Sequence, residues 1–263
     1  MIHHVEGETI PEVWLAAADR LLKQEGYSAH SMILDIRQPA KMTPADFRVF
    51  DQVDDFLREH DRYPLVTVAG TIFPAGLYLS HGPAGVYDLY PNKVYPKIKA
   101  NWGTYAYRIL HRDRKDGASM NPLQVLVEKL RKQVKGGHAL RAAYELNSVD
   151  VFTDIPLYDS ASDSTRTLNQ PCLSHLSFRL RTANSLMLTA LYRSHYYVQK
   201  TLGNLLGLAQ LQSFVAEQAD LEIGPLICHS TYATLETEPK VWNKSDIEKL
   251  VGKCHAAIGN KAA

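Results

Sequence analysis

The stretch from Pro171 to Ser194 reads PCLSHLSFRLRTANSLMLTALYRS. Residues 175–182 alternate between apolar and polar side chains, a pattern typical of a strand with one buried face. Asn184-Ser185 is a turn signal, and an apolar, strand-like run returns directly after it. The stretch therefore predicts a β-hairpin, with Cys172 just ahead of its first strand.

Residues 201–219, which follow the hairpin, are apolar on almost every side of a helix (TLGNLLGLAQLQSFVAEQA). A helix without a polar face does not lie on a protein surface, so we expect this one to pass through the core. The next apolar segment, residues 221–228, predicts a further strand.

Start signals and helical spacing of apolar residues predict other helices at residues 11–24, 43–57 and 122–132, with a solvated helix at 245–258. Strand-like runs occupy residues 32–36, 139–144 and 149–152, and residues 160–169 are polar and turn-like. Residues 74–101 are dense in Gly, Pro and Tyr, which predicts a long ordered loop.

The bulk composition bounds the class of protein. With 263 residues and 45% hydrophobic content, the chain fits a single domain spanning residues 1–263. A net charge of +1 gives no global field for nucleic acid or an anionic membrane. The N-terminus lacks the layout of a signal peptide, no apolar run approaches the ~18 residues of a membrane span, and three scattered cysteines suggest free thiols. We therefore expect a cytoplasmic protein.

Five short motifs follow one another along the chain: Pro171-Cys172, a hairpin ending in LYRS at Arg193-Ser194, a helix with an LGN step ending at Asn204, Asp220 to Gly224 (DLEIG), and a strand ending near Cys228 to Tyr232 (CHSTY), with the block Trp102 to Ile109 (WGTYAYRI) upstream of them. In this order and at this spacing they resemble the second half of the thymidylate synthases and the related pyrimidine hydroxymethylases. The resemblance covers about residues 100–236. Residues 1–100 match only in the rough order of their elements, and residues 237–263 form a C-terminal helix outside it.

The resemblance implies an α/β (α+β) fold of the thymidylate synthase type, with a large mixed β-sheet covered by helices and one buried central helix. It also implies a homodimer formed sheet to sheet. The expected partner is a small-molecule substrate, a pyrimidine nucleotide, with no membrane and no nucleic acid involved.

The resemblance also assigns chemical roles. A pyrimidine C5 attacks a one-carbon electrophile only after a thiolate has added to C6, and Cys172 would be that thiolate. Arg193 would help the thiol to ionise, Arg193 and Ser194 would hold the substrate anion, and Tyr105 would lie near the reacting ring. Asn204 would bind the edge of the base with its paired donor and acceptor.

Three further substrate-binding residues are expected on weaker matches: His229 and Tyr232 for the sugar, and Arg141 for the phosphate. Ordinary structural roles compete with the functional ones. Cys172 could be packing at a strand start, Tyr105 could be a core residue, and Asn204 could be a helix N-cap.

The chain departs from the family at several positions. Residues 65–73 contain no acid where the family has the glutamate that relays protons to the pyrimidine carbonyl. Tyr196 stands where the family has the aspartate that holds the pterin, and Gly137-His138 stand near the position of its phosphate-binding arginine pair. The histidines and cysteines form no zinc-type spacing, so no metal is expected.

The functional prediction is a divergent one-carbon transferase that places a methyl or hydroxymethyl group on C5 of a pyrimidine nucleotide or related ring. The resemblance implies 5,10-methylenetetrahydrofolate as the donor. Two alternatives stay open: a catalytically silent nucleotide- or anion-binding homologue, and a cysteine-dependent enzyme that acts on a non-pyrimidine substrate without folate.

Overall fold

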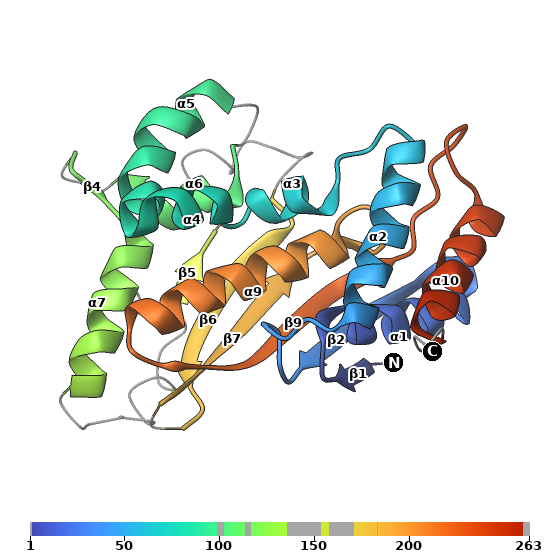
Figure 1. The fold of residues 1–263 in the computed structure, drawn as a ribbon, viewed down its shortest axis with the longest axis horizontal. Helices are drawn as coiled ribbons and strands as arrows, with labels where there is room; N and C mark the ends of the chain where they lie inside the picture. Colours follow the sequence, from blue (N-terminus) through green and yellow to red (C-terminus); the bar gives the residue numbers. More distant parts are fainter. Residues whose placement is uncertain are drawn as a thin grey trace.

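The computed structural model describes residues 2–98, 103–113, 117–135, 154–157, 171–182 and 184–259 (Figure 1). The helices are α1 (Ile10–Leu22), α2 (Pro44–Glu59), α3 (Leu65–Gly70), α4 (Ala75–Ala84), α5 (Tyr95–Ile98), α6 (Tyr105–Leu110), α7 (Pro122–Lys135), α9 (Thr201–Gln218) and α10 (Lys244–Gly259), with the short helical segments η1 (Glu25–Tyr27) and η2 (Gly85–Val94). The strands are β1 (His3–Gly7), β2 (Ser28–Ile36), β3 (Arg112–Asp113), β4 (Ser119–Met120), β5 (Asp154–Pro156), β6 (Leu173–Leu180), β7 (Ser185–Tyr192), β8 (His195–Tyr196) and β9 (Glu222–Thr234).

Seven of the described strands form a mixed sheet in the order β1-β2-β9-β7-β6-β5, with β8 beside β9, and β3 and β4 form a separate two-stranded sheet. The β1–β2 and β7–β9 pairs are parallel, whereas β2–β9, β6–β7 and β5–β6 are antiparallel. The predicted hairpin is confirmed, because β6 and β7 pair with Phe178 opposite Leu188. The mixed sheet expected from the sequence is present.

Only one face of this sheet is fully buried across its central strands. Leu34, Cys228 and Ala190 lie side by side in the register of β2, β9 and β7, and none of them is exposed. Their neighbours on the other face, Ile227 and Thr189, are partly exposed. Strand side chains alternate between faces, so the described helices cover one side of the sheet.

Helix α9 is the buried central helix that the sequence predicts. It crosses β7 and β9 and is covered in turn by α3, so that it lies between two layers (Figure 1). The close approach of α3 requires glycine, because a Cβ at Gly203 would stand 2.7 Å from the Cβ of Val68, and one at Gly207 would stand 2.7 Å from the carbonyl oxygen of Ala69. The position of α3 over α9 is thereby fixed.

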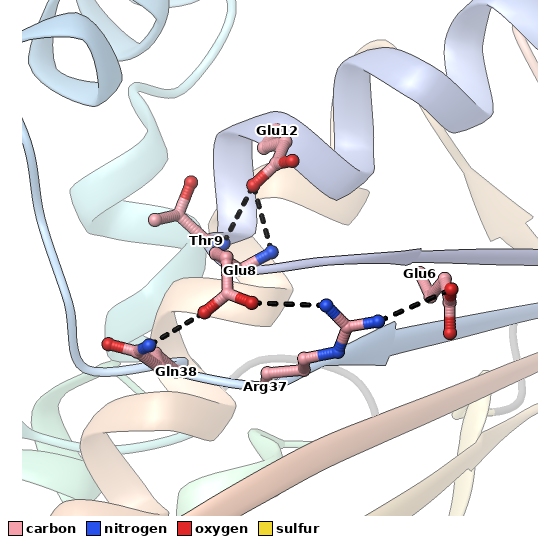
Figure 2. Close-up of polar contacts among 6 residues, drawn as sticks. All are labelled: Glu6, Glu8, Thr9, Glu12, Arg37 and Gln38. Atoms are coloured by element: carbon pink, nitrogen blue, oxygen red, sulfur yellow. Dashed lines mark hydrogen bonds and ion pairs between the residues drawn. The ribbon is translucent and has the colours of Figure 1, made fainter.

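The start of α1 is tied to the first two strands by a polar cluster, which Figure 2 shows. Glu12 accepts hydrogen bonds from the backbone N–H groups of Glu8 and Thr9, as in a capping box. The Glu8 carboxylate in turn accepts from Arg37 and Gln38, which follow β2. Strand β1 itself was not predicted from the sequence.

The prediction of a long loop over residues 74–101 is wrong, because α4, η2 and α5 make the described part of it helical. Gly82, with φ of 59°, ends one helical turn, and Pro83 begins the next, where its missing N–H costs nothing. One side of these helices packs into the core, where the side chains of Val86, Tyr90 and Tyr95 are buried. Glycine and proline in this segment therefore lie at breaks between short helices and do not form a long loop.

Helix α10 is also not simply solvated as predicted. Ile247, Leu250, Val251 and Cys254 are buried against the other helices, so one face belongs to the core. The strand candidates at residues 139–144 and 149–152 and the polar turn at 160–169 lie outside the described residues. None of the described helices is both long and apolar enough to cross a membrane.

Candidate functional site

A cleft of about 1020 Å³ opens where α3, the start of α6, the start of β6 and the N-terminal end of α9 meet. Its size is at the upper end of what small-molecule sites in proteins occupy. Four of the predicted site residues line it together: Tyr105, Cys172, Ser194 and Asn204. They come from separate motifs of the sequence and are brought to one wall by the sheet and by α9.

Tyr105 holds the Cys172 segment in place from the first turn of α6. Its phenolic oxygen accepts hydrogen bonds from the backbone N–H groups of Cys172 at 3.1 Å and Leu173 at 3.3 Å. Thr104 caps the helix by accepting from the N–H of Tyr107. Burial raises the pKa of Tyr105 to about 12, so the phenol stays neutral and fixes the backbone at the start of β6.

Arg193 lies beside Cys172 at the end of the hairpin. Its guanidinium donates to the carbonyl oxygen of Pro171 at 2.7 Å, and its backbone N–H donates to the carbonyl oxygen of Cys172 at 2.9 Å. With Pro171, Leu173 and Ser174 it lines a separate small cavity of about 150 Å³. Arg193 therefore flanks the cysteine rather than lining the large cleft.

The thiol of Cys172 is partly buried, and burial raises its pKa above the usual range of a cysteine. The nearby Arg193 charge lowers the pKa but does not outweigh the desolvation. The sequence predicted that Arg193 favours the thiolate, and the effect of its charge on the Cys172 pKa is in that direction. In the unliganded protein, however, the thiol is protonated at neutral pH.

Asn204 is fixed by a hydrogen-bond chain that the sequence did not reveal. The Nδ2 atom of Asn204 lies 2.9 Å from Nε2 of His195, and Nδ1 of His195 lies 3.0 Å from the hydroxyl of Ser230. Helix α9 begins at Thr201, so Asn204 is not an N-cap. With Nδ2 turned to the histidine, the amide oxygen and the second N–H are free to meet a ligand in the cleft.

His195 is 1% exposed and stacks on the ring of Tyr192 at 3.9 Å between centroids. Burial lowers the pKa of His195 to about 3, so the imidazole is neutral. A neutral ring has one donor and one acceptor nitrogen. Since Nε2 accepts from Asn204, Nδ1 carries the proton and donates to Ser230, which sets the orientation of the whole chain.

The remaining predicted residues are not brought to the cleft. His229 lies on β9 between Cys228 and Ser230, and alternation turns it to the opposite face of the sheet from these two. The ring of Tyr232 packs against the ring of His30, with 5.4 Å between the ring centroids. Neither residue lines the cleft, and Arg141 lies outside the described residues.

His195 and Lys200 are among the cleft residues that the sequence did not point to. A signal existed for Lys200, because a lone lysine directly before an apolar helix must reach either solvent or a cavity. Behind it lies Glu236, whose carboxylate accepts from the N–H groups of Val198 and Gln199 at 3.1 and 2.9 Å. Burial raises the pKa of Glu236 to about 7.

The family resemblance implies a folate, whose pterin ring would have to bind in the cleft. The donor-rich edge of a pterin needs strong acceptors such as a carboxylate. The described lining of the cleft contains no carboxylate, and Tyr196 stands at its edge, about half exposed. These residues do not fit a pterin. Among the described residues there is also no group of three or more His, Cys, Asp or Glu side chains arranged to hold a metal.

Comparison with protein-family models gives no match, and comparison with curated proteins gives no significant match.

Proposed function

We propose that this chain is a divergent one-carbon transferase related to the thymidylate synthases and pyrimidine hydroxymethylases. Its substrate is a pyrimidine nucleotide or a related ring, and its product carries a methyl or hydroxymethyl group at C5. The observation that supports this proposal is the meeting of Tyr105, Cys172, Ser194 and Asn204 in one cleft. Their motifs lie far apart in the sequence and meet only in the folded chain.

The chemistry proceeds through the thiol. Cys172 loses its proton to solvent water and its sulfur forms a bond to C6, while the C5–C6 π electrons move toward the C4 carbonyl as an enolate. C5 then attacks the one-carbon electrophile, and loss of the C5 proton and of the sulfur restores the ring. Arg193 stabilises the thiolate from beside the cleft, Ser194 holds the substrate anion from the cleft wall with Arg193 assisting from the small cavity, and Asn204 holds the edge of the base. Because the described lining does not fit a pterin, no step is assigned to folate.

Ligand binding must assist ionisation of Cys172, since burial raises its pKa in the free protein. A ring placed against the sulfur adds no positive charge by itself, so proton loss and addition to C6 occur together in this scheme. Tyr105 contributes by fixing the backbone N–H groups on either side of the sulfur-bearing residue.

The assembly proposed is a homodimer of cytoplasmic location, with the open faces of two sheets packed together. This is supported by the partly exposed apolar side chains on that face, among them Ile33, Leu191 and Ile227. The same face carries the polar side chains Asp35, Thr189 and His229 beside them, and interfaces between protein chains commonly mix apolar and polar groups in this way.

The test is hydrogen exchange at C5 of UMP, CMP, dUMP and dCMP, each labelled at C5, with no folate added. Release of label by the wild type, abolished in Cys172→Ala, would support nucleophilic addition and identify the substrate. Absence of release from all four would contradict the proposal. A Cys172→Ser variant, which keeps the size and polarity of the side chain, controls for loss of binding.

A second candidate is a catalytically silent binding protein with the same cleft, and the raised pKa of Cys172 favours it. It predicts that Cys172→Ala binds a nucleotide as tightly as the wild type and that neither protein releases label from C5. Isothermal titration of both proteins with the four nucleotides separates this candidate from the enzyme.

A further inference from the structure

Lys200 occupies a fixed position on the wall of the cleft. Its backbone N–H donates to the carbonyl oxygen of Tyr196 at 3.1 Å, and its own carbonyl oxygen accepts from the N–H of Asn204 at 2.8 Å. Lys200 and Asn204 are therefore one helical turn apart and line the same cleft. These two backbone hydrogen bonds tie the main chain at Lys200 to the start of α9.

The charged groups behind Lys200 are already engaged with one another. Arg62 forms an ion pair with Glu238, which also accepts a hydrogen bond from Gln199. The Glu236 carboxylate accepts from the backbone N–H groups of Val198 and Gln199. Within the described part of the chain, the Lys200 ammonium makes no hydrogen bond and no ion pair, although Glu236 is near enough to influence it.

This arrangement is electrostatically costly as it stands. Burial lowers the pKa of Lys200, Arg62 lowers it further, and Glu236 raises it. A partly desolvated ammonium without a hydrogen-bonded counter-charge destabilises the charged state, and a bound anion removes that penalty. A cation held in this way on the wall of a cleft is suited to an anionic ligand group.

The cationic position at Lys200 is separate from the cationic position at Arg193. Arg193 sits at the Cys172 end, donates to the carbonyl oxygen of Pro171 and lines the small cavity. Lys200 lines the large cleft, together with three partly or largely exposed apolar side chains, Tyr63 at 71%, Ile98 at 50% and Tyr196 at 49%. Such surfaces accept a planar or apolar ligand body.

We infer that Lys200 is a second anion-binding residue of the cleft. It receives the carboxylate or phosphate of a ligand whose apolar body lies against Tyr63, Ile98 and Tyr196. This inference does not depend on addition of Cys172 to a pyrimidine. A cleft of about 1020 Å³ has room for such a ligand beside, or as part of, the molecule bound near Cys172.

The test compares ligands that differ in one charge: UMP with uridine, and 2-naphthoate with 2-naphthamide. The starting protein for isothermal titration is Cys172→Ala, in which covalent addition cannot contribute. Three double variants are compared with it, each carrying Cys172→Ala together with Lys200→Met, Lys200→Arg or Lys41→Met. Lys41 is exposed in the segment before α2, which makes it the matched control. Lys200→Met should weaken the charged member of a pair by about ten-fold and leave the neutral member unchanged. Lys200→Arg and Lys41→Met should retain the preference.

The two pairs distinguish the source of the anion. A loss confined to UMP assigns Lys200 to a nucleotide phosphate, and a loss confined to 2-naphthoate assigns it to an organic carboxylate. The inference is overturned if the starting protein prefers neither charged ligand, or if Lys200→Met weakens charged and neutral members equally. Absence of C5 exchange would contradict the proposed reaction but not the role of Lys200 in anion binding, because the titration is carried out without the Cys172 thiol.

Discussion

Single side chains around the cleft show how burial and neighbouring charges oppose each other. Burial raises the pKa of Cys172 while Arg193 lowers it, and burial alone lowers the pKa of His195 to about 3. Cys172 is therefore a protonated thiol at neutral pH. His195 is a neutral imidazole that orients the side-chain amide of Asn204. Both states follow from desolvation, which penalises whichever form is charged.

Replacement of Arg193 by methionine should make Cys172 less reactive at any given pH. Removal of the guanidinium removes the charge that lowers the thiol pKa, so the pH profile of alkylation shifts upward. The measurement is the rate of iodoacetamide labelling at Cys172, followed by mass spectrometry from pH 7 to 10. The buried Cys228 and Cys254 serve as internal references within each sample. An unchanged profile would mean that Arg193 does not act on the thiol.

Replacement of His195 by phenylalanine should change how stability depends on pH. An unfolded histidine, with its ordinary pKa of 6.5, takes up a proton as the pH falls, whereas the folded one does not until about pH 3. The stability that His195 contributes is therefore complete above pH 6.5 and is lost as the pH falls toward 3, by at most about 1.4 kcal/mol per pH unit.

Urea unfolding of His195→Phe at pH 7 and pH 5 should show a smaller loss of stability on acidification than the wild type. At pH 7 the variant should be less stable by about 1–3 kcal/mol, because Asn204 and Ser230 lose their partner. His30→Phe, at an exposed position of β2, is the control and should behave as the wild type does. Parallel pH dependence in all three proteins would refute the assignment of a neutral His195.

At the scale of the elements, the cleft depends on the contact between α3 and α9. Helix α3 has only six residues, so its own helical propensity contributes little, and its position comes from packing on the glycines of α9. The same contact places Thr67 and Thr71 of the α3 segment on the wall of the cleft. Any side chain inserted between these helices should disturb the site as well as the fold.

Substitution of Gly203 by alanine should destabilise the protein by about 1–3 kcal/mol, because the new methyl group would overlap Val68 and the carbonyl oxygen of Leu65. The matched control is Gly252→Ala in α10, where a Cβ meets nothing within 4 Å. That change should stabilise by about 0.4–1 kcal/mol, since alanine favours a helix. Denaturant midpoints measure both, and equal effects of the two substitutions would contradict the packing described.

At the scale of the whole molecule, the helices that the structure describes lie on one side of the sheet, and within the described residues the other side is partly exposed. This one-sided arrangement is the basis for proposing a second copy as the cover of the open face. The partly exposed apolar positions on that face are spread over β2, β7 and β9, and they alternate with the polar neighbours Asp35, Thr189 and His229.

Ile227→Arg should therefore yield a monomer, because a charge would be buried between the sheets. Light scattering coupled to gel filtration measures the mass directly. Leu79→Arg, on the exposed surface of α4 at 85% exposure, should leave the dimer intact. A monomeric wild type at micromolar concentration would contradict the proposed homodimer.

The sequence by itself determined the features that depend on neighbours along the chain. The β6–β7 hairpin, α1, α2, α7 and the buried helix α9 follow from periodicity and turn residues, whereas the grouping of Cys172, Ser194 and Asn204 into one site was implied only by the family resemblance. Local patterns suffice there because a strand or helix must present its apolar side chains on a regular spacing.

Only the tertiary structure decided the features that depend on residues far apart in the chain. It added β1 as a parallel strand, made residues 75–98 helical, turned His229 away from the cleft and brought His195, Lys200 and Glu236 to it or behind it. The neutrality of His195 and the protonated state of Cys172 belong to the same group. Burial and electrostatic neighbours arise only when the elements pack, so no periodicity in the sequence encodes them directly.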